Sequence, residues 1–149
     1  MKRRVLSIAL AGFALTLLAS ATAFAQLPNE PIRAKIPFDF SVRGKTLPAG
    51  EYEIKRVTDE MATLEIANVN HRHEHVMFET DPVETNQIKR HGEIVFHRYG
   101  DSYFLYEIWT AGLGTGHELP TSHQERTLER EAAMYGTNSR AETVALAAE

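Results

Sequence analysis

Hydrophobic and polar side chains alternate with a two-residue period over much of the chain, which is typical of β-strands with one buried face. The clearest case is residues 93–109, where two runs rich in aromatic and β-branched side chains flank Gly100-Asp101. That pair favours the positive φ angles of a two-residue turn. The pattern therefore predicts a β-hairpin. Because it holds the only tryptophan and three of the five tyrosines, it should form the densest part of the core.

The predicted hairpin has a definite register if the strands pair without interruption. On one face His97 then lies opposite Phe104, and Val95 lies opposite Tyr106. Both faces are largely apolar, whereas a hairpin with one face in water would alternate more cleanly. We therefore expect the hairpin to be covered on both sides.

Shorter alternating stretches, separated by turn residues, precede the hairpin. With its two strands they give six predicted strands: residues 36–42, 51–55, 61–69, 71–80, 93–99 and 102–109. Residues 26–35 contain two prolines and are expected to be an extended lead-in. The prediction is a mainly β fold, an antiparallel six-stranded meander that forms a small barrel or a sandwich. The sequence alone does not separate these two forms.

One C-terminal α-helix is predicted after the hairpin. Ser122 and Glu125 have the spacing of a capping box, and Gly136 stands where a C-terminal cap belongs, so the helix should span residues 122–135. We expect it to pack on the sheet as the second cover of the hairpin. The residues of its narrow apolar stripe are Leu128, Ala132 and Tyr135. A single domain would then span residues 36–136, followed by a flexible tail over residues 137–149.

Residues 1–25 have the features of a signal peptide. A basic start is followed by a nearly unbroken apolar run from Val5 to Leu18 and by the small-x-small site Ala23-Phe24-Ala25. Cleavage before Gln26 would give an exported protein, periplasmic or extracellular, with no transmembrane span. The alternative is an uncleaved membrane anchor, since the apolar segment is just long enough to cross a bilayer.

Charge and cysteine content narrow the classes of partner. Three of the 16 basic residues and none of the 20 acidic ones lie in residues 1–25, so the remainder carries a formal net charge of −7. This balance argues against nucleic acid and anionic membranes as partners. The chain has no cysteine, so an exported form would rely on its hydrophobic core rather than on disulfides.

Four short motifs within residues 36–130 resemble a family of small exported bacterial β-rich proteins that has no assigned function. They are PFDF at 37–40, LPAGEY at 47–52, FHRYGDxYFL at 96–105 and ELPxSxxER at 118–126. The resemblance implies one exported β-rich domain and brings no catalytic or binding residues. The histidine-rich stretch at residues 71–75 is not part of this pattern.

That stretch, His71-Arg72-His73-Glu74-His75, is the main candidate for metal chemistry. On a strand the three histidines share a face, and His73, His75 and Glu79 are spaced like the first histidine motif of cupins. The flanking glycines and the second motif of cupins are missing. Because residues i and i+4 of a strand are about 13 Å apart, all three histidines bind one ion only if the strand bends. The alternative is a polar, solvated strand face.

Four residues are expected to have structural roles: Arg98, Glu107, Glu125 and Trp109. Arg98 lies on an otherwise apolar face and needs an anionic partner, for which Glu107 and Glu125 are the candidates. A partnership with Glu125 would hold the helix on the sheet. His97, opposite an aromatic ring, is interpreted as a core histidine rather than as a general base.

The leading hypothesis is a non-catalytic, exported β-domain without a cofactor, which binds or scaffolds at the cell envelope. Its partner would be an envelope protein, a glycan or a small ligand, held by the aromatic core or by the loop at Gly112–Gly116. That glycine-rich loop does not enter a helix directly, so flexibility is the preferred interpretation over phosphate binding. The alternatives are a metal-binding, cupin-like protein that uses the His71–His75 strand and, more weakly, a hydrolase whose site the sequence does not reveal, for which loss of catalysis in His97→Ala would be the test.

Overall fold

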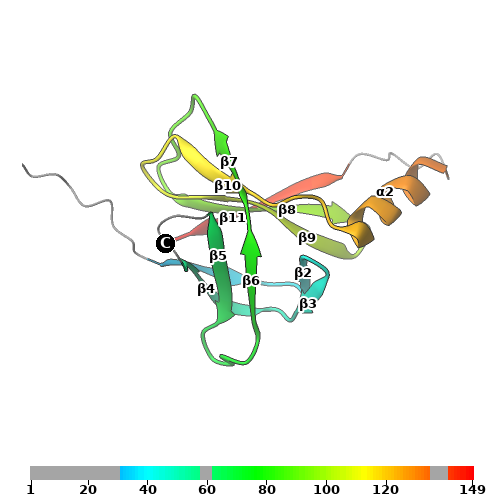
Figure 1. The fold of residues 1–149 in the computed structure, drawn as a ribbon, viewed down its shortest axis with the longest axis horizontal. Coiled ribbons are helices and arrows are strands. Elements are labelled where there is room, and N and C mark those ends of the chain that lie inside the picture. The colour runs from blue at the N-terminus through cyan, green and yellow to red at the C-terminus, as the bar shows by residue number, and fades with distance from the viewer. Residues whose placement is uncertain (1–30, 58–61, 135–140) are drawn as a thin grey trace, which may run out of the picture.

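The computed structural model of the chain describes residues 31–57, 62–134 and 141–149. These residues form two β-sheets and one α-helix, so the mainly β fold class is confirmed (Figure 1). The predicted signal peptide, residues 1–25, lies outside the described residues. Among the residues that are described, no helix has the length and apolar character needed to cross a membrane.

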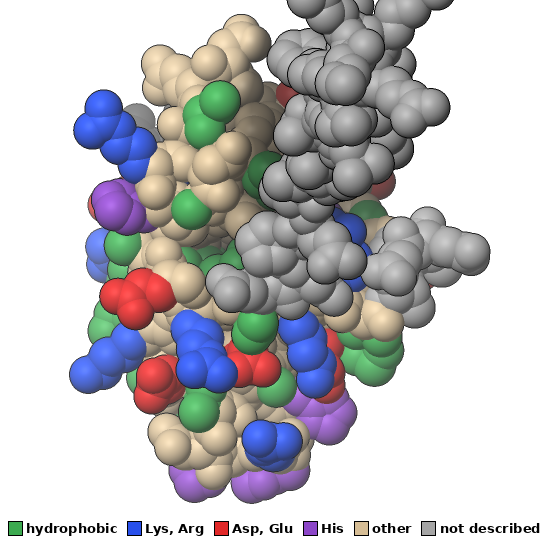
Figure 2. All heavy atoms as spheres, turned by 90° about the vertical axis from the view of Figure 1, so that its left-hand side faces the viewer, with side chains coloured by type: hydrophobic (Ala, Val, Ile, Leu, Met, Phe, Trp, Pro, Cys, Tyr) green, Lys and Arg blue, Asp and Glu red, His purple; other side chains and the backbone are tan. Residues whose placement is uncertain are grey.

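The first sheet has four antiparallel strands, in the order β1 (Ile32–Ile36), β4 (Gly50–Arg56), β5 (Thr63–Asn68) and β6 (His75–Glu79). Its inner face is formed by alternate apolar side chains, as the sequence pattern requires. Its outer face carries cross-strand ion pairs, Arg33–Glu53 at 2.9 Å and Lys55–Glu65 at 3.0 Å. Figure 2 shows one face of the molecule on which basic and acidic side chains lie side by side, with histidines at its lower end.

The second sheet is built around the predicted hairpin, β8 (Gly92–Tyr99) and β9 (Ser102–Trp109), whose antiparallel pairing is confirmed. Its order is β11 (Glu142–Ala148), β8, β9, β10 (Thr115–Glu118) and β7 (Asp81–Glu84). A short hairpin of β2 (Phe40–Val42) and β3 (Lys45–Leu47) joins β9 through a parallel bridge between Ser41 and Phe104.

The two sheets face each other across one hydrophobic core to which both contribute. The ring of Phe40 stands edge-on to Tyr52 of the first sheet at 5.1 Å and to Phe96 of the second at 5.5 Å. All three side chains are among the largest that are completely buried. Of the two predicted forms, the structure is therefore the sandwich.

The sheets also meet at two corners. The chain passes directly from β6 to β7 through Thr80, whose Oγ1 donates to the carbonyl of Ala62 at 2.9 Å. The same oxygen lies 3.0 Å from Nδ1 of His117 in β10, so the imidazole must donate this second hydrogen bond. At the other corner the backbones of Arg33 and Glu149 exchange two hydrogen bonds, at 2.7 and 2.9 Å. Each corner involves only a few bonds, so the sheets do not close into a barrel.

Two segments that were expected to lack regular structure are strands, which corrects the predicted boundaries. Residues 32–36, of which 32–35 belong to the expected lead-in at 26–35, form β1 and pair along β4. Residues 142–148, inside the expected flexible tail at 137–149, form β11 and pair with most of β8. Two of its side chains, Val144 and Leu146, pack against the core. The described chain therefore has eleven strands rather than six.

The hairpin register differs from the uninterrupted pairing at one place. His97 lies opposite Phe104 as predicted, but Val95 lies opposite Glu107, and Tyr106 is left as the extra residue of a β-bulge. The bulge shifts the second half of β9 by one residue. In consequence Ile108 points into the core, where strict alternation from Leu105 would have placed Glu107.

The helix α2 (His123–Met134) covers less of the hairpin than predicted. Its only buried residue is Glu125, in the first turn, while Leu128 and Ala132 of the predicted stripe are half-buried. The far end leads away from the sheets, and Met134 is 81% exposed (Figure 1). Residue Tyr135 lies outside the described residues. The outer face of the hairpin is therefore covered by the start of the helix and not by its whole length.

Candidate functional site

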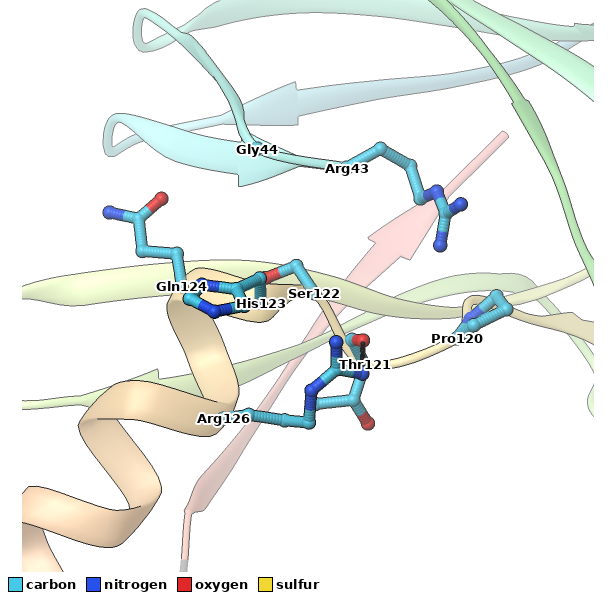
Figure 3. A pocket seen from close by; sticks show the side chains of 8 residues that line it. All are labelled: Arg43, Gly44, Pro120, Thr121, Ser122, His123, Gln124 and Arg126. Carbon is cyan, nitrogen blue, oxygen red and sulfur yellow. Dashed lines mark hydrogen bonds between the residues drawn. The ribbon is translucent and has the colours of Figure 1, made fainter.

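A surface cleft of about 490 Å³ lies between the turn that joins β2 to β3 and the start of α2 (Figure 3). Arginines approach it from both sides. Arg43 comes from the turn and Arg126 from the first turn of the helix, and their guanidinium groups face the gap (Figure 3). The other lining residues are Gly44, Pro120, Thr121, Ser122, His123 and Gln124.

The backbone at Arg43 is fixed by an uncommon turn. Val42 pairs with Lys45, so the loop has only two residues, and both Arg43 and Gly44 have positive φ, 52° and 88°. Two such residues in a row make the type I′ turn that suits the twist of a hairpin. Arg43 is the only non-glycine residue with positive φ in the described part of the chain. Left-handed backbone is costly for a long side chain, so this position is set by the hairpin and not by the preference of arginine.

The helix side of the cleft is held by the predicted N-terminal cap. The Oγ of Ser122 accepts a hydrogen bond from the backbone N–H of Glu125 at 3.1 Å, which confirms Ser122 as the capping residue. Arg126 donates from Nη1 to the carbonyl of Thr121 at 2.7 Å. This bond fixes the guanidinium beside the cleft and leaves its remaining N–H groups available to a ligand.

The cleft has an electrostatic character opposite to that of the whole chain. Its eight lining residues include two arginines and one histidine but no aspartate or glutamate. The whole chain, in contrast, has a formal net charge of −4. The Ser122 cap already uses one backbone N–H of the helix start, so the guanidinium groups supply most of the positive charge. The arrangement suits an anionic group with several acceptor oxygens.

The cleft offers binding groups but not an assembled catalytic set. Of the two hydroxyl side chains in its lining, Thr121 and Ser122, the second accepts the cap hydrogen bond, and His123 lies exposed at the rim. A nucleophile needs a base within hydrogen-bonding distance, and the cleft shows no such hydrogen-bonded pair among its described residues.

The structure does not bring the predicted metal ligands together, because residues 71–74 form a turn and β6 begins only at His75. The expectation of three histidines on one strand face was therefore wrong. His75 Nδ1 is 3.0 Å from the carbonyl of Arg72, and Glu79 lies at the other end of β6. Within the described ranges, no group of three His, Cys, Asp or Glu side chains is placed to hold a metal ion. The side chains of His73, in the turn, and of Glu79, at the end of β6, are both exposed to solvent.

The buried acid of the helix is paired with His97 and not with Arg98. Nδ1 of His97 lies 2.7 Å from Oε1 of Glu125, and the imidazole stacks on Tyr106 with ring centroids 3.8 Å apart. Arg98 donates to the carbonyl of Gly100 at 2.7 Å and contacts a different acid, Glu142 of β11, at 3.3 Å. The predicted partners of Arg98 were therefore wrong, although a polar pair does hold the helix on the sheet.

Trp109 and Glu107 form a second structural pair at the far end of the hairpin. The indole Nε1 donates to Oε2 of Glu107 at 2.8 Å, and Lys89 lies 5.6 Å from the ring centroid. The indole also lies against Gly116, where an added Cβ would lie 2.6 Å from the ring. Gly116 belongs to β10, so the glycine-rich segment is partly strand rather than a free loop. Its glycine makes room for the tryptophan.

Sequence reasoning missed Arg43 and Arg126 because they are far apart in the chain and neither lies in a pattern of known chemistry. The only local signals were the turn at Arg43-Gly44 and the capping box at Ser122. Comparisons with protein-family models, with curated proteins and with solved structures found no match. The function is therefore argued from the residues and their arrangement.

Proposed function

We propose that this chain is an exported, non-catalytic β-domain protein of the bacterial cell envelope. It binds an anionic ligand in the cleft between Arg43 and Arg126. The ligand presents a carboxylate or phosphate group, as an acidic glycan or a small organic acid does. Export is supported by the signal-peptide pattern of residues 1–25.

One observation carries the proposal: two guanidinium groups from different elements line a cleft whose described lining residues include no acidic side chain. Guanidinium groups bind carboxylates and phosphates through paired, charge-assisted hydrogen bonds. The bond to Thr121 positions the Arg126 guanidinium before the ligand arrives, and the tight turn fixes the backbone from which Arg43 extends. This lowers the entropic cost of binding.

The binding test uses glucuronate and inorganic phosphate as probes and glucose as the uncharged comparison, with isothermal titration calorimetry on the form that accumulates after export. We expect at least one of the two anions to bind and glucose not to bind. Arg43→Asn removes the charge and keeps a residue that tolerates positive φ. Arg126→Gln removes the second charge. Each should weaken binding by about tenfold, the loss expected for one charge-assisted hydrogen bond.

Arg130→Gln is the matched control, because Arg130 lies on the same helix outside the cleft. It should bind like the unsubstituted protein. Equal affinity in all three variants would reject the cleft as the binding site. Absence of binding for both anions at millimolar concentration would reject the anionic ligand class. Export is tested separately by the mass of the accumulated protein, which should correspond to a chain beginning at Gln26.

A further inference from the structure

On its open side, β6 at the edge of the first sheet pairs with no other strand among the described residues. β6 pairs with β5 on one side only, over His75 to Glu79. An unpaired strand edge exposes a row of N–H and C=O groups that can pair with another strand. The cleft beside this edge, about 390 Å³, is lined by Arg43, Thr63, Met77, Phe78 and Glu79.

The hydrogen bonds around β6 show which groups face outward. The Asn68 N–H donates to the Glu74 carbonyl, and the Thr80 N–H donates to that of Ala62, so even-numbered residues bond to β5. In an antiparallel pair the alternate residues direct their backbone groups away from the partner. His75, Met77 and Glu79 therefore present their N–H and C=O groups to the open side. In agreement, the carbonyl of His75 accepts a hydrogen bond from Lys45 Nζ at 2.9 Å.

The exposed side chains of β6 are complementary to those of a second, antiparallel β6. An exposed methionine, Met77 at 56%, stands between His75 and Glu79, which are both exposed. If a second β6 pairs antiparallel about Met77, each His75 lies opposite a Glu79, and Met77 lies opposite its own copy. Unlike partners at the ends and an apolar contact in the middle stabilise such a pairing. Every residue of β6 is matched in this register.

We propose that two copies of this chain associate through β6 into a symmetric dimer. Met77 lies on the two-fold axis, and His75 faces Glu79 of the other copy. The two four-stranded sheets join into one continuous sheet across the interface. A two-fold axis requires the same surface on both copies, and β6 meets this requirement. Lys45, which now bonds to the His75 carbonyl, gives up this contact when the second strand binds.

Cysteine cross-linking tests the register, since the chain has no cysteine of its own. In Met77→Cys the two thiols lie opposite each other, with Cα atoms about 5.5 Å apart, a distance that suits a disulfide. Mild oxidation of the exported protein should give a covalent dimer. Glu79→Cys, whose copies lie about 13 Å apart along the strand, should not. Equal cross-linking of both variants, or of Met134→Cys on the helix, would overturn the proposal.

Exchanging the charges of His75 and Glu79 tests whether these residues face each other in the dimer. Dimer dissociation is measured by sedimentation equilibrium. His75→Glu places two acids opposite each other, and Glu79→Lys places lysine opposite histidine. Each single variant should raise the dissociation constant by about tenfold, and the double variant should restore it. Glu131→Lys makes the same charge change on the exposed helix and should leave the constant unchanged. A monomeric unsubstituted protein, or a double variant no tighter than the singles, would refute the dimer.

Discussion

Nδ1 of His97 in β8 and Oε1 of Glu125 in α2 are 2.7 Å apart, and this contact joins the helix to the hairpin. Glu125 is only 5% exposed, so its carboxylate depends on the imidazole for a hydrogen-bond donor. Tyr106, the bulged residue of β9, stacks on the same ring and fixes its plane. The bulged residue and the helix therefore both contact His97.

Replacing either member of this pair should destabilise the domain by about 2–3 kcal/mol, since the other is left buried without its partner. Glu125→Ala and His97→Ala should each show this loss in urea unfolding. The double variant should cost little more than either single one, because the two residues act together. Glu129→Ala, at an exposed position of the same helix, should change stability by about 0.5 kcal/mol or less. A loss no larger for Glu125→Ala than for Glu129→Ala would contradict the assigned contact.

The corner at His117 should make stability fall in acid. Burial, and secondarily the charge of Arg56, lowers the pKa of His117 from its ordinary value of 6.5. Below that value the unfolded chain binds a proton that the folded chain resists, so the contribution is complete above pH 6.5 and is lost as the pH falls toward the folded pKa. His117→Gln should flatten this part of the pH profile of urea unfolding. An unchanged slope between pH 7 and 5 would show that other groups cause it.

The hairpin turn should show the opposite dependence in alkali. Burial, followed by the carboxylates of Glu125 and Glu129, raises the pKa of Tyr99 to about 12. Between its ordinary value of 10.0 and that pKa, the unfolded chain has lost a proton that the folded chain keeps, so stability falls as the pH rises. Tyr99→Phe should reduce this fall, measured as the urea midpoint at pH 9, 10 and 11. Equal losses in the two proteins would contradict the prediction.

The packing of the tryptophan can be tested with two glycines of one segment. Gly116→Ala places a methyl group 2.6 Å from the Trp109 ring and should cost about 1–3 kcal/mol, the range for overpacking a filled site. Gly114→Ala is the control, because its nearest contact, Thr85 O, is at an ordinary 3.5 Å. Intrinsic fluorescence reports on the site directly, since Trp109 is the only tryptophan. A Gly116→Ala protein with unchanged stability and emission would contradict this packing.

The turn before β6 depends on one buried amide. Asn68, 3% exposed, donates to Glu74 at 3.0 Å and accepts from the N–H groups of Asn70 and His71 at 2.9 and 3.0 Å. Asn68→Ala should cost about 2 kcal/mol in thermal or urea unfolding, because these polar groups lose their partner. Asn86→Ala, at an exposed position, should be nearly neutral. Similar losses for the two variants would argue against this role.

The hairpin was predictable because its information is local. Gly100 has a φ of 60°, as the turn requires, and the strands on either side carry strong β-formers. The bulge at Tyr106 was not predictable from alternation, because it is an extra residue that tertiary packing selects. β11 escaped detection for a different reason. Its alternate alanines differ little in size or polarity from their neighbours, so the two-residue pattern is faint.

Among the site residues, too, local features were predictable and those set by tertiary packing were not. The cap at Ser122 was found from four consecutive positions, whereas the choice of His97 over Arg98 as partner of Glu125 depends on which hairpin face the helix covers. Alternation places the two residues on opposite faces but does not say which face meets the helix. The cleft between Arg43 and Arg126 arises only when a turn and a helix from distant parts of the chain come together.

The paired backbone bonds between Arg33 and Glu149 join residues 116 positions apart, and β11 pairs with the edge of β8 that β9 leaves open. Contacts of such long range slow folding, because a large loop must close before they form. The sandwich cannot be completed until residues 142–149 have left the ribosome. Pairing of this last strand should therefore be a late step of folding, which a C-terminal truncation at residue 141 would abolish.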